Sequence, residues 1–269
     1  MLRQEIMIER VRQICADDPR LVSAMMYGSF TRGEGDIWSD IEFLLFFDDA
    51  AVQQIDQRRW VEQIGAVGLY FVNEFGNGTT IFEDLVRGEF HFDPVSSVAK
   101  VSSWRGSAAF PLLAATLIVD KNGELTRHLR TLIGPQPAHD DHDQLIFICN
   151  SLMNWMLFGA NVLARGEYAR SLELLGIVQR YLLWLVRIHE GQTEHWQTPS
   201  KNLEAEISAR AYARLVECSA ALDPCALRLA YRGAWKWGCE LMEAVAGKYD
   251  LPLPRGLFEP ISRRVEAAD

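Results

Sequence analysis

The segment from Tyr27 to Phe43, YGSFTRGEGDIWSDIEF, carries the most distinctive chemistry in the chain. Gly28 and Ser29 follow an apolar run that predicts a strand, and they precede a predicted short helix. Glycine lets the backbone approach a ligand closely, and the N–H groups at the start of a helix form a positive cradle for phosphate. The Ser29 hydroxyl can donate to the same oxygens. Most Gly-Ser pairs are ordinary turns, so the acidic residues downstream decide how this pair is interpreted.

Asp40 and Glu42 begin the next predicted strand, IEFLLFF. Side chains alternate along a strand, so the two carboxylates share one face while Ile41 packs into the core. Neighbouring carboxylates repel each other unless a cation neutralises them. Mg²⁺ prefers such oxygen ligands and takes one or two carboxylates together with substrate phosphates. A solvated strand face is the ordinary alternative, but the apolar residues after Glu42 argue against an edge in water.

A third carboxylate, Glu89, lies in the predicted strand LVRGEFHF, with Phe90 and Phe92 on the opposite face. If this strand lies beside the strand of Glu42, Glu89 completes an acidic triad. Two carboxylates would then hold a metal ion while Glu89 takes a proton from an attacking hydroxyl. In a second version, two metal ions bind and Glu89 is partly a metal ligand. The sequence leaves both versions open.

The neighbours of Glu89 on its own strand add further candidates. Asp93 is a competitor for the role of third carboxylate, because alternation places it on the same face near the end of the strand. Arg87 shares that face and could pair with Glu89 or contact a triphosphate. His91 is as well explained by a structural role as by a place in the site.

The elements that must position these residues mix helical and strand periodicity in the first half of the chain. We predict helices over residues 2–16 and 48–65 from their spacing of apolar residues. Short apolar, aromatic or β-branched runs separated by turn residues predict strands. These runs are LVSAMMYGS, IEFLLFF, GLYFVNEF, TTIFED, LVRGEFHF and ATLIVDKNG.

The second half is almost purely helical in its pattern. The segment IGPQPAHDDHD, with its prolines, glycine and charges, interrupts all periodicity. Helices are expected over 142–165, 167–190, 201–221 and 223–249, followed by a tail to 267. We therefore expect an α+β protein with a mixed-sheet domain over 1–134 and an all-helical bundle over 135–269.

Composition excludes several classes of protein. Of the 269 residues, 49% are hydrophobic and 23% charged, which is ordinary for a globular protein. The net charge of −9 argues against a general nucleic-acid binder. The five cysteines form no Cys-x-x-Cys pair, no signal peptide is evident, and no apolar run approaches the roughly 20 residues of a membrane span. We expect a soluble, cytoplasmic protein that does not bind membranes.

Together these motifs resemble a known family. Gly-Ser, a spaced Asp-x-Glu and a third acidic residue on a later strand form the pattern of the nucleotidyltransferase superfamily that includes DNA polymerase beta. MMYGSFTRGEGDIWSDIEF and RGEFHF, followed by RGEYARSLELL and SKNLEAEIS, are similar to the lincosamide nucleotidyltransferases, which are bacterial antibiotic-resistance enzymes. The resemblance runs over essentially the whole chain. The two later motifs are more specific than the superfamily pattern.

The resemblance implies a defined activity. Family members transfer AMP from ATP to a hydroxyl of lincomycin or clindamycin and release pyrophosphate with Mg²⁺; the resemblance favours the branch that acts at the 3-hydroxyl. It also implies a homodimer, with a polymerase beta-like N-terminal domain and a helical C-terminal domain. Carried onto this chain, Asp40 and Glu42 match the metal carboxylates, Glu89 the general base, and Gly28 with Ser29 the phosphate-binding turn.

Two later motifs have both a functional and a structural interpretation. Arg165 and Arg170 stand near the start of a predicted helix, where arginines would suit an anionic nucleotide. A structural interpretation has equal weight, in which Arg165 caps the preceding helix and Tyr168 packs between helices. Arg170 is retained as a nucleotide-binding candidate. Lys201 and Asn202 could bind phosphate or cap a helix, and capping is slightly favoured.

Two other functions remain open from the sequence. The first is the same transfer to another small alcohol such as an aminoglycoside, although a polycation would require a strongly acidic pocket, whereas a lincosamide carries one amine and an apolar tail. The second is a catalytically silent fold that binds a protein partner. Retention of three carboxylates argues against the second function, because buried like charges are costly without a metal ion.

Overall fold

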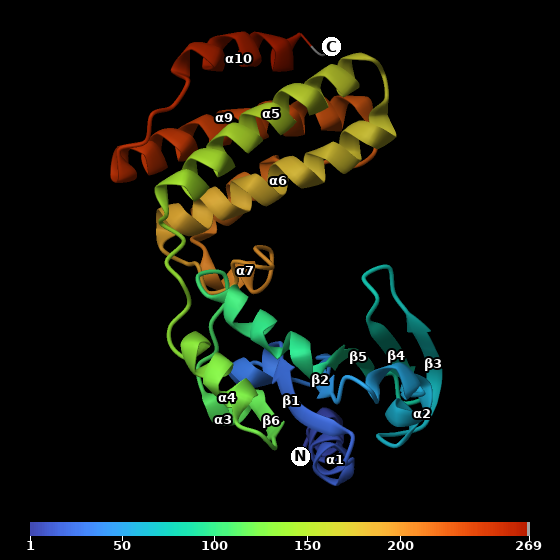
Figure 1. The fold of residues 1–269 in the computed structure, drawn as a ribbon. Helices are drawn as coiled ribbons and strands as arrows, with labels where there is room; N and C mark the ends of the chain where they lie inside the picture. The colour runs from blue at the N-terminus through green and yellow to red at the C-terminus, as the bar shows by residue number, and fades with distance from the viewer. Residues whose placement is uncertain (268–269) are drawn as a thin grey trace. The chain divides into compact units, whose positions relative to one another are not determined.

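The protein is described here by a computed structural model of residues 1–267, shown in Figure 1. The chain divides into a first compact unit, Met1–Gln136, and a second that begins at Pro137. The predicted boundary after residue 134 lies in the same connecting segment. The expected α+β class is confirmed, because the first unit contains a mixed sheet and the second is built from helices.

The first unit contains six strands and four short or medium α-helices among its described residues. In chain order its elements are α1 (Arg3–Asp17), β1 (Leu21–Tyr27), η1 (Ser29–Arg32), β2 (Ile41–Phe47), η2 (Val52–Gln54), α2 (Gln57–Glu62), β3 (Val67–Val72), β4 (Gly78–Phe82), β5 (Arg87–Pro94), η3 (Val95–Trp104), α3 (Leu113–Thr116), β6 (Leu117–Asp120), α4 (Glu124–Leu129) and η4 (Arg130–Leu132), where η marks a 3₁₀ helix.

The strands form one sheet in the order β3-β4-β5-β2-β1-β6. All neighbouring pairs are antiparallel except β2 and β5, which are parallel. The connection between β2 and β5 contains α2 and the β3–β4 hairpin, and this is long enough for the crossover that a parallel pair requires. β2 lies inside the sheet, which explains why its sequence is a nearly continuous apolar run.

The two faces of the sheet are covered by different elements. One face carries Phe43 and Phe90 in a core that also contains residues of α1 and α2. Leu44 and Phe46 of β2 lie in a second core, which contains residues of η3 and α4. The alternation predicted for β2 is thus observed. Ile41 is buried, and its neighbours Asp40 and Glu42 are partly exposed.

Two predictions for this unit need correction. The single helix predicted over 48–65 is interrupted: η2 ends before Asp56, which begins α2 by accepting a hydrogen bond from the Arg59 backbone N–H. Asp56 thus acts as a helix cap within the sequence that we assigned to a continuous helix. The strand predicted from Ala115 starts only at Leu117, because the preceding residues form the short helix α3.

The second unit is a helical bundle. It contains α5 (His142–Ala164), α6 (Tyr168–Glu190), α7 (Leu203–Glu206), α8 (Ala209–Glu217), α9 (Pro224–Tyr249), the 3₁₀ helix η5 (Arg255–Leu257) and α10 (Phe258–Glu266). The predicted helix over 201–221 is divided into α7 and α8. The division falls where the side chain of Ser208 caps α8 by accepting a hydrogen bond from the Ala211 N–H.

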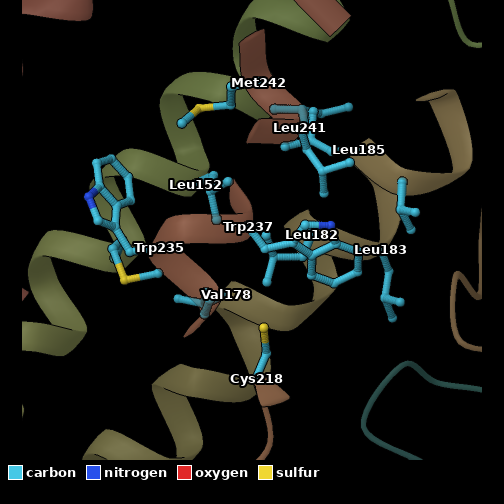
Figure 2. Packing of buried hydrophobic residues seen from close by; sticks show 14 of the residues in the cluster. Leu152, Val178, Leu182, Leu183, Leu185, Cys218, Trp235, Trp237, Leu241 and Met242 are labelled. Carbon is cyan, nitrogen blue, oxygen red and sulfur yellow. The ribbon is translucent and has the colours of Figure 1, made fainter. Parts of the chain in front are cut away.

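The bundle has one continuous hydrophobic core. Leu152 of α5, Leu182 of α6 and Leu241 of α9 belong to it, and Figure 2 shows them together with Trp235 and Trp237. Gly238 of α9 lies against Leu152, where a Cβ atom would come within 2.9 Å of a leucine methyl carbon. An alanine at this position would therefore require the Leu152 side chain to shift.

One helix departs from the expectation that no segment could span a membrane. Among the described residues, α5 alone is long and apolar enough to do so by length and composition. Half of the apolar window of α5 is buried within the protein, where it packs against α6 and α9. The core helix of a bundle meets the same length and composition test, so the observation is explained by packing.

A buried arginine fixes the segment between α6 and α8. The side chain of Arg187 is completely buried and donates to the carbonyl oxygens of Gln192, Pro199 and Lys201 at 2.7–2.8 Å. It also donates to the carboxylate of Glu206 at 2.6 Å. A buried charge is tolerated when it is paired and fully hydrogen-bonded. This arrangement explains how a segment without regular structure keeps one conformation.

The turn between α1 and β1 provides a test of the first unit. The Asp18 carboxylate accepts hydrogen bonds from the backbone N–H of Arg20 at 3.0 Å and from its guanidinium at 2.8 and 2.9 Å. Burial raises the pKa of Asp18, but the hydrogen bonds from Arg20 outweigh burial and lower the pKa below its ordinary value. A lowered native pKa stabilises the fold above the unfolded-state pKa, and this stabilisation is lost as the pH falls through the native pKa.

Asp18→Asn should therefore lower the free energy of unfolding by about 1 kcal/mol at pH 7. The difference from wild type should shrink as the pH falls below about 3.9, the ordinary pKa of an aspartate. Urea titrations at several pH values measure both effects. Asp17→Asn, at the exposed neighbouring position, is the matched control and should change little. A difference for Asp18→Asn that stays constant down to pH 2 would contradict this account.

Candidate functional site

Strand pairing brings together two of the predicted carboxylates. In the parallel pair of β2 and β5, Glu42 lies directly opposite Glu89. In the antiparallel pair of β1 and β2, Tyr27 lies opposite Glu42. Paired residues project from the same face of a sheet, so Tyr27, Glu42 and Glu89 form a row across three strands. The condition stated for the acidic triad, that the strand of Glu89 lie beside that of Glu42, is confirmed.

Arg87 connects the remaining carboxylate to this row. Its guanidinium donates one hydrogen bond to Asp40, just before β2, and another to Oε2 of Glu89 at 2.9 Å. The Asp40 side chain is 30% exposed and the Glu89 side chain 18% exposed. Arg87 therefore bridges two of the three carboxylates and offsets their repulsion. Of the two predicted roles for Arg87, pairing with Glu89 is observed.

The electrostatic environment keeps Glu89 ionised. Burial alone would raise the pKa of Glu89, but the hydrogen bond from Arg87 and the charge of its guanidinium lower the pKa below the ordinary value. At neutral pH the carboxylate is therefore an acceptor for hydrogen bonds and protons. The competitor for its role, Asp93, forms an ion pair with Lys100 at 2.6 Å.

Three polar side chains surround Oε1 of Glu89. The Tyr27 hydroxyl lies at 3.3 Å, His91 Nε2 at 3.2 Å and Asn77 Nδ2 at 3.4 Å. Burial, together with the charges of Glu42 and Glu89, raises the pKa of Tyr27, so its hydroxyl keeps its proton. Burial lowers the pKa of His91, so the imidazole is neutral at pH 7. These contacts fix the direction of the Glu89 carboxylate.

The Gly28–Ser29 turn lies directly against Glu42. Gly28 has φ +81°, a conformation that favours glycine, and a Cβ atom at this position would overlap Oε2 of Glu42. Ser29 begins the 3₁₀ helix η1, as the sequence predicts a short helix here. The Ser29 hydroxyl oxygen is buried and has no hydrogen-bond partner among residues 1–267. A buried hydroxyl without a partner is costly, and a ligand oxygen would satisfy it.

The donor chemistry of this face fits a magnesium ion bound together with phosphates. Within the described part of the chain, no group of three or more His, Cys, Asp or Glu side chains has the spacing to hold a metal ion. Asp40 and Glu89 are each paired with Arg87 instead. Mg²⁺ needs only one or two carboxylates when phosphates and water supply the other ligands. The assignment of Asp40, Glu42 and Glu89 as metal ligands stays a prediction.

Structural roles are observed for three of the predicted residues of the second unit. Arg165 is the C-cap residue of α5, and Tyr168 packs against the core of the bundle. Arg170 lies 3.3 Å from the Glu167 carboxylate, and its guanidinium lies over the ring of Phe158 at 5.3 Å. Asn202 occupies the N-cap position of α7 without a capping hydrogen bond from its side chain. The nucleotide-binding role of Arg170 stays a prediction.

Two polar residues around Glu89 are missing from the sequence-based site. Tyr27 lies opposite Glu42 only because β1 pairs antiparallel with β2 in one register. Asn77 reaches Glu89 from the turn between β3 and β4. A sequence reveals periodicity within a strand but not the register between strands, so the position of Tyr27 just before Gly28 was the only available signal.

The second unit of the chain matches a known family of domains. Residues 141–263 match the family model for the lincosamide nucleotidyltransferase-like C-terminal domain. The match runs from the N-cap of α5 into α10 and includes almost all of the second unit. The second unit is therefore similar to the C-terminal domain of lincosamide nucleotidyltransferase-like proteins, as the later sequence motifs predict.

Solved structures are similar only distantly. An aminoglycoside 6-adenyltransferase from Bacillus subtilis matches with 15% identity and a TM-score of 0.46, covering 100% of this chain and 98% of that one. A nucleotidyltransferase-like protein from Exiguobacterium sibiricum matches with 15% identity and a TM-score of 0.40, covering 90% and 78%. No curated protein matches the chain.

The Gly28 turn yields a prediction with a matched control. Gly28→Ala should lower turnover at least tenfold, because the new methyl group must displace the Glu42 carboxylate. Because φ is positive at this position, the substitution should also lower the free energy of unfolding by about 1 kcal/mol. Gly123 has nearly the same φ, +80°, but open space around its Cβ position. Gly123→Ala should therefore show the stability loss with near wild-type turnover, and equal turnover in the two variants would contradict the proposed contact.

Proposed function

We propose that this protein transfers AMP from ATP to a hydroxyl of a lincosamide such as lincomycin or clindamycin, and that this transfer inactivates the drug. The observation that carries the proposal is the pairing of Glu42 and Glu89 on adjoining strands, with Asp40 at one end and the Gly28–Ser29 turn against Glu42. The lincosamide-type C-terminal domain supports the choice of acceptor.

The proposed reaction is a direct in-line transfer. The acceptor oxygen attacks the α-phosphorus of ATP, a new P–O bond forms, and the bond between the α-phosphorus and the bridging oxygen breaks to release pyrophosphate. Glu89 takes the proton from the acceptor hydroxyl as the new bond forms. Its lowered pKa ensures that it is ionised at neutral pH. Positioning and neutralisation of charge supply most of the rate enhancement, as in other phosphoryl transfers.

Asp40 and Glu42 would hold Mg²⁺ together with the phosphates of ATP, and the ion would neutralise the charge that develops on the phosphate oxygens. For Asp40 to act as a ligand, Arg87 must release it. The guanidinium could then pair with a phosphate, because arginine binds carboxylate and phosphate with the same geometry. The Ser29 hydroxyl would donate to the phosphates. The proposal includes a cytoplasmic homodimer, as in the family that the sequence resembles.

A pyrophosphate-release assay with Mg²⁺ and a panel of lincosamides and aminoglycosides tests the proposal. Wild type should release pyrophosphate only with a lincosamide and Mg²⁺ present. Asp40→Asn and Glu42→Gln should abolish transfer. Glu89→Gln should still bind ATP but should turn over about 10²–10⁴ times more slowly, which is the usual contribution of a positioned base.

A set of controls separates these roles. Asp93→Asn changes a carboxylate of the same strand that is paired with Lys100, and it should retain near wild-type turnover. If the loss in Glu89→Gln lay entirely in the KM for ATP, Glu89 would be a nucleotide or metal ligand and not a base. Near wild-type turnover in Asp40→Asn or Glu42→Gln would overturn the metal assignment.

The position of the modified hydroxyl is a separate prediction. We expect AMP on the 3-hydroxyl of the sugar, and both lincomycin and clindamycin should be accepted because the two drugs differ away from the sugar. The choice depends on which hydroxyl lies within roughly 3–3.5 Å of the α-phosphorus. NMR of the product should show phosphorus coupling to the proton on carbon 3. Coupling to the proton on carbon 4 would refute this assignment.

A further inference from the structure

The face of the sheet that carries Glu89 continues beyond the site onto β4 and β3. In the β4–β5 pair, Thr79 lies opposite Glu89 and Ile81 lies opposite Arg87. In the β3–β4 pair, Phe71 lies opposite Thr79 and Leu69 lies opposite Ile81. Paired residues share a face, so Leu69, Phe71 and Ile81 extend the face of the candidate base. We call these three residues the apolar shelf.

The apolar shelf is exposed although its neighbours on the same face are covered. At the β1–β2 end of this face, Met25 and Leu44 are buried in a core with residues of η3 and α4. At the other end, Leu69 is 47% exposed, Phe71 44% and Ile81 37%. Apolar side chains scattered singly on a surface are common, but three adjacent ones beside a polar site are typical of a binding surface.

The position of the shelf relative to Glu89 suits the acceptor of the proposed reaction. Neighbouring strands are about 4.8 Å apart, so Phe71 lies roughly 10 Å from Glu89 across the sheet. A molecule whose hydroxyl contacts Glu89 must place the rest of its structure on adjoining surface. The Asn77 amide contacts Glu89, and Thr79 accepts a hydrogen bond from Asn73, so the hairpin that carries the shelf is tied to the site.

The chemistry of the apolar shelf favours one class of acceptor alcohol. Its three side chains are uncharged and apolar, and Thr79 between Phe71 and Glu89 is uncharged as well. Covering apolar surface with an apolar group is favourable, whereas placing several ammonium groups on it would require costly desolvation. A hydroxylated ring with one apolar arm fits this surface, and a polycationic amino sugar does not.

We propose that the apolar shelf of Leu69, Phe71 and Ile81 binds the non-reacting apolar arm of an amphiphilic alcohol whose hydroxyl is presented to Glu89. This inference rests on the proposed function and names residues that determine acceptor specificity. The shelf acts on binding of the acceptor and takes no part in the transfer of the phosphoryl group. It therefore affects the KM for the acceptor and not the KM for ATP.

The test compares Phe71→Ser with Val72→Ser, which changes an exposed residue of the same strand on the opposite face. Calorimetry should show clindamycin binding about five- to tenfold more weakly to Phe71→Ser than to wild type, with Val72→Ser unchanged. The amino sugar of the drug without its apolar arm should bind all three proteins equally. In the pyrophosphate assay, the KM for ATP should not change. Thermal melting should confirm that both variants fold.

Each outcome decides between the two proposals. If wild type adenylylates clindamycin but Phe71→Ser binds it as tightly as wild type, the shelf is overturned and the proposed function stands. The shelf is also overturned, and the proposed function stands, if Val72→Ser weakens clindamycin binding as much as Phe71→Ser does. If weaker binding accompanies a lower molecular mass of Phe71→Ser in light scattering, the shelf is a contact between subunits and the inference is overturned. If wild type neither binds nor modifies any lincosamide, the proposed function fails, and the assignment of the shelf fails with it.

Discussion

The parallel pairing of β2 with β5 is the constraint on which the candidate site depends. It places Glu42 opposite Glu89 although 46 residues of chain separate them, and it makes β2 an inner strand with side chains buried on both faces. The site can therefore be no more flexible than the hydrophobic core. The apolar character of Phe43 and Leu44, which fill the two faces just beyond Glu42, holds the carboxylates at their positions.

This pairing creates an electrostatic problem that Arg87 offsets. Three carboxylates gathered at one end of two strands would repel each other, and their partial burial would increase the cost. The guanidinium of Arg87 contacts two of them, and the Tyr27 hydroxyl of β1 donates a hydrogen bond to Glu89. In the proposed reaction the site receives a metal ion and a polyanion, so a temporary counter-charge is needed until they bind. An arginine two residues from Glu89 can supply it and then bind phosphate.

Periodicity predicted most of the fold and the identity of the main acidic residues. α1, β1 and β2, and the long helices of the second unit, follow from their spacing of apolar residues. The breaks at Asp56 and Ser208 were not predicted, because a polar residue inside a helical pattern becomes a cap only when tertiary packing favours two short helices. Tyr27 and Asn77 were missed for a different reason: their place in the site depends on pairing between strands.

The buried Arg187 has a consequence for the dynamics of the second unit. Its four acceptors lie within the 192–206 segment, which contains little regular structure beyond the short helix α7. Local opening of this segment would leave the buried guanidinium of Arg187 without its acceptors. Opening therefore costs more free energy than it does for an ordinary loop. The hydrogen-bonded backbone amides of this segment, such as that of Lys201, should therefore exchange with solvent slowly, and proteases should cut the chain elsewhere. We therefore expect this irregular segment to unfold together with the bundle.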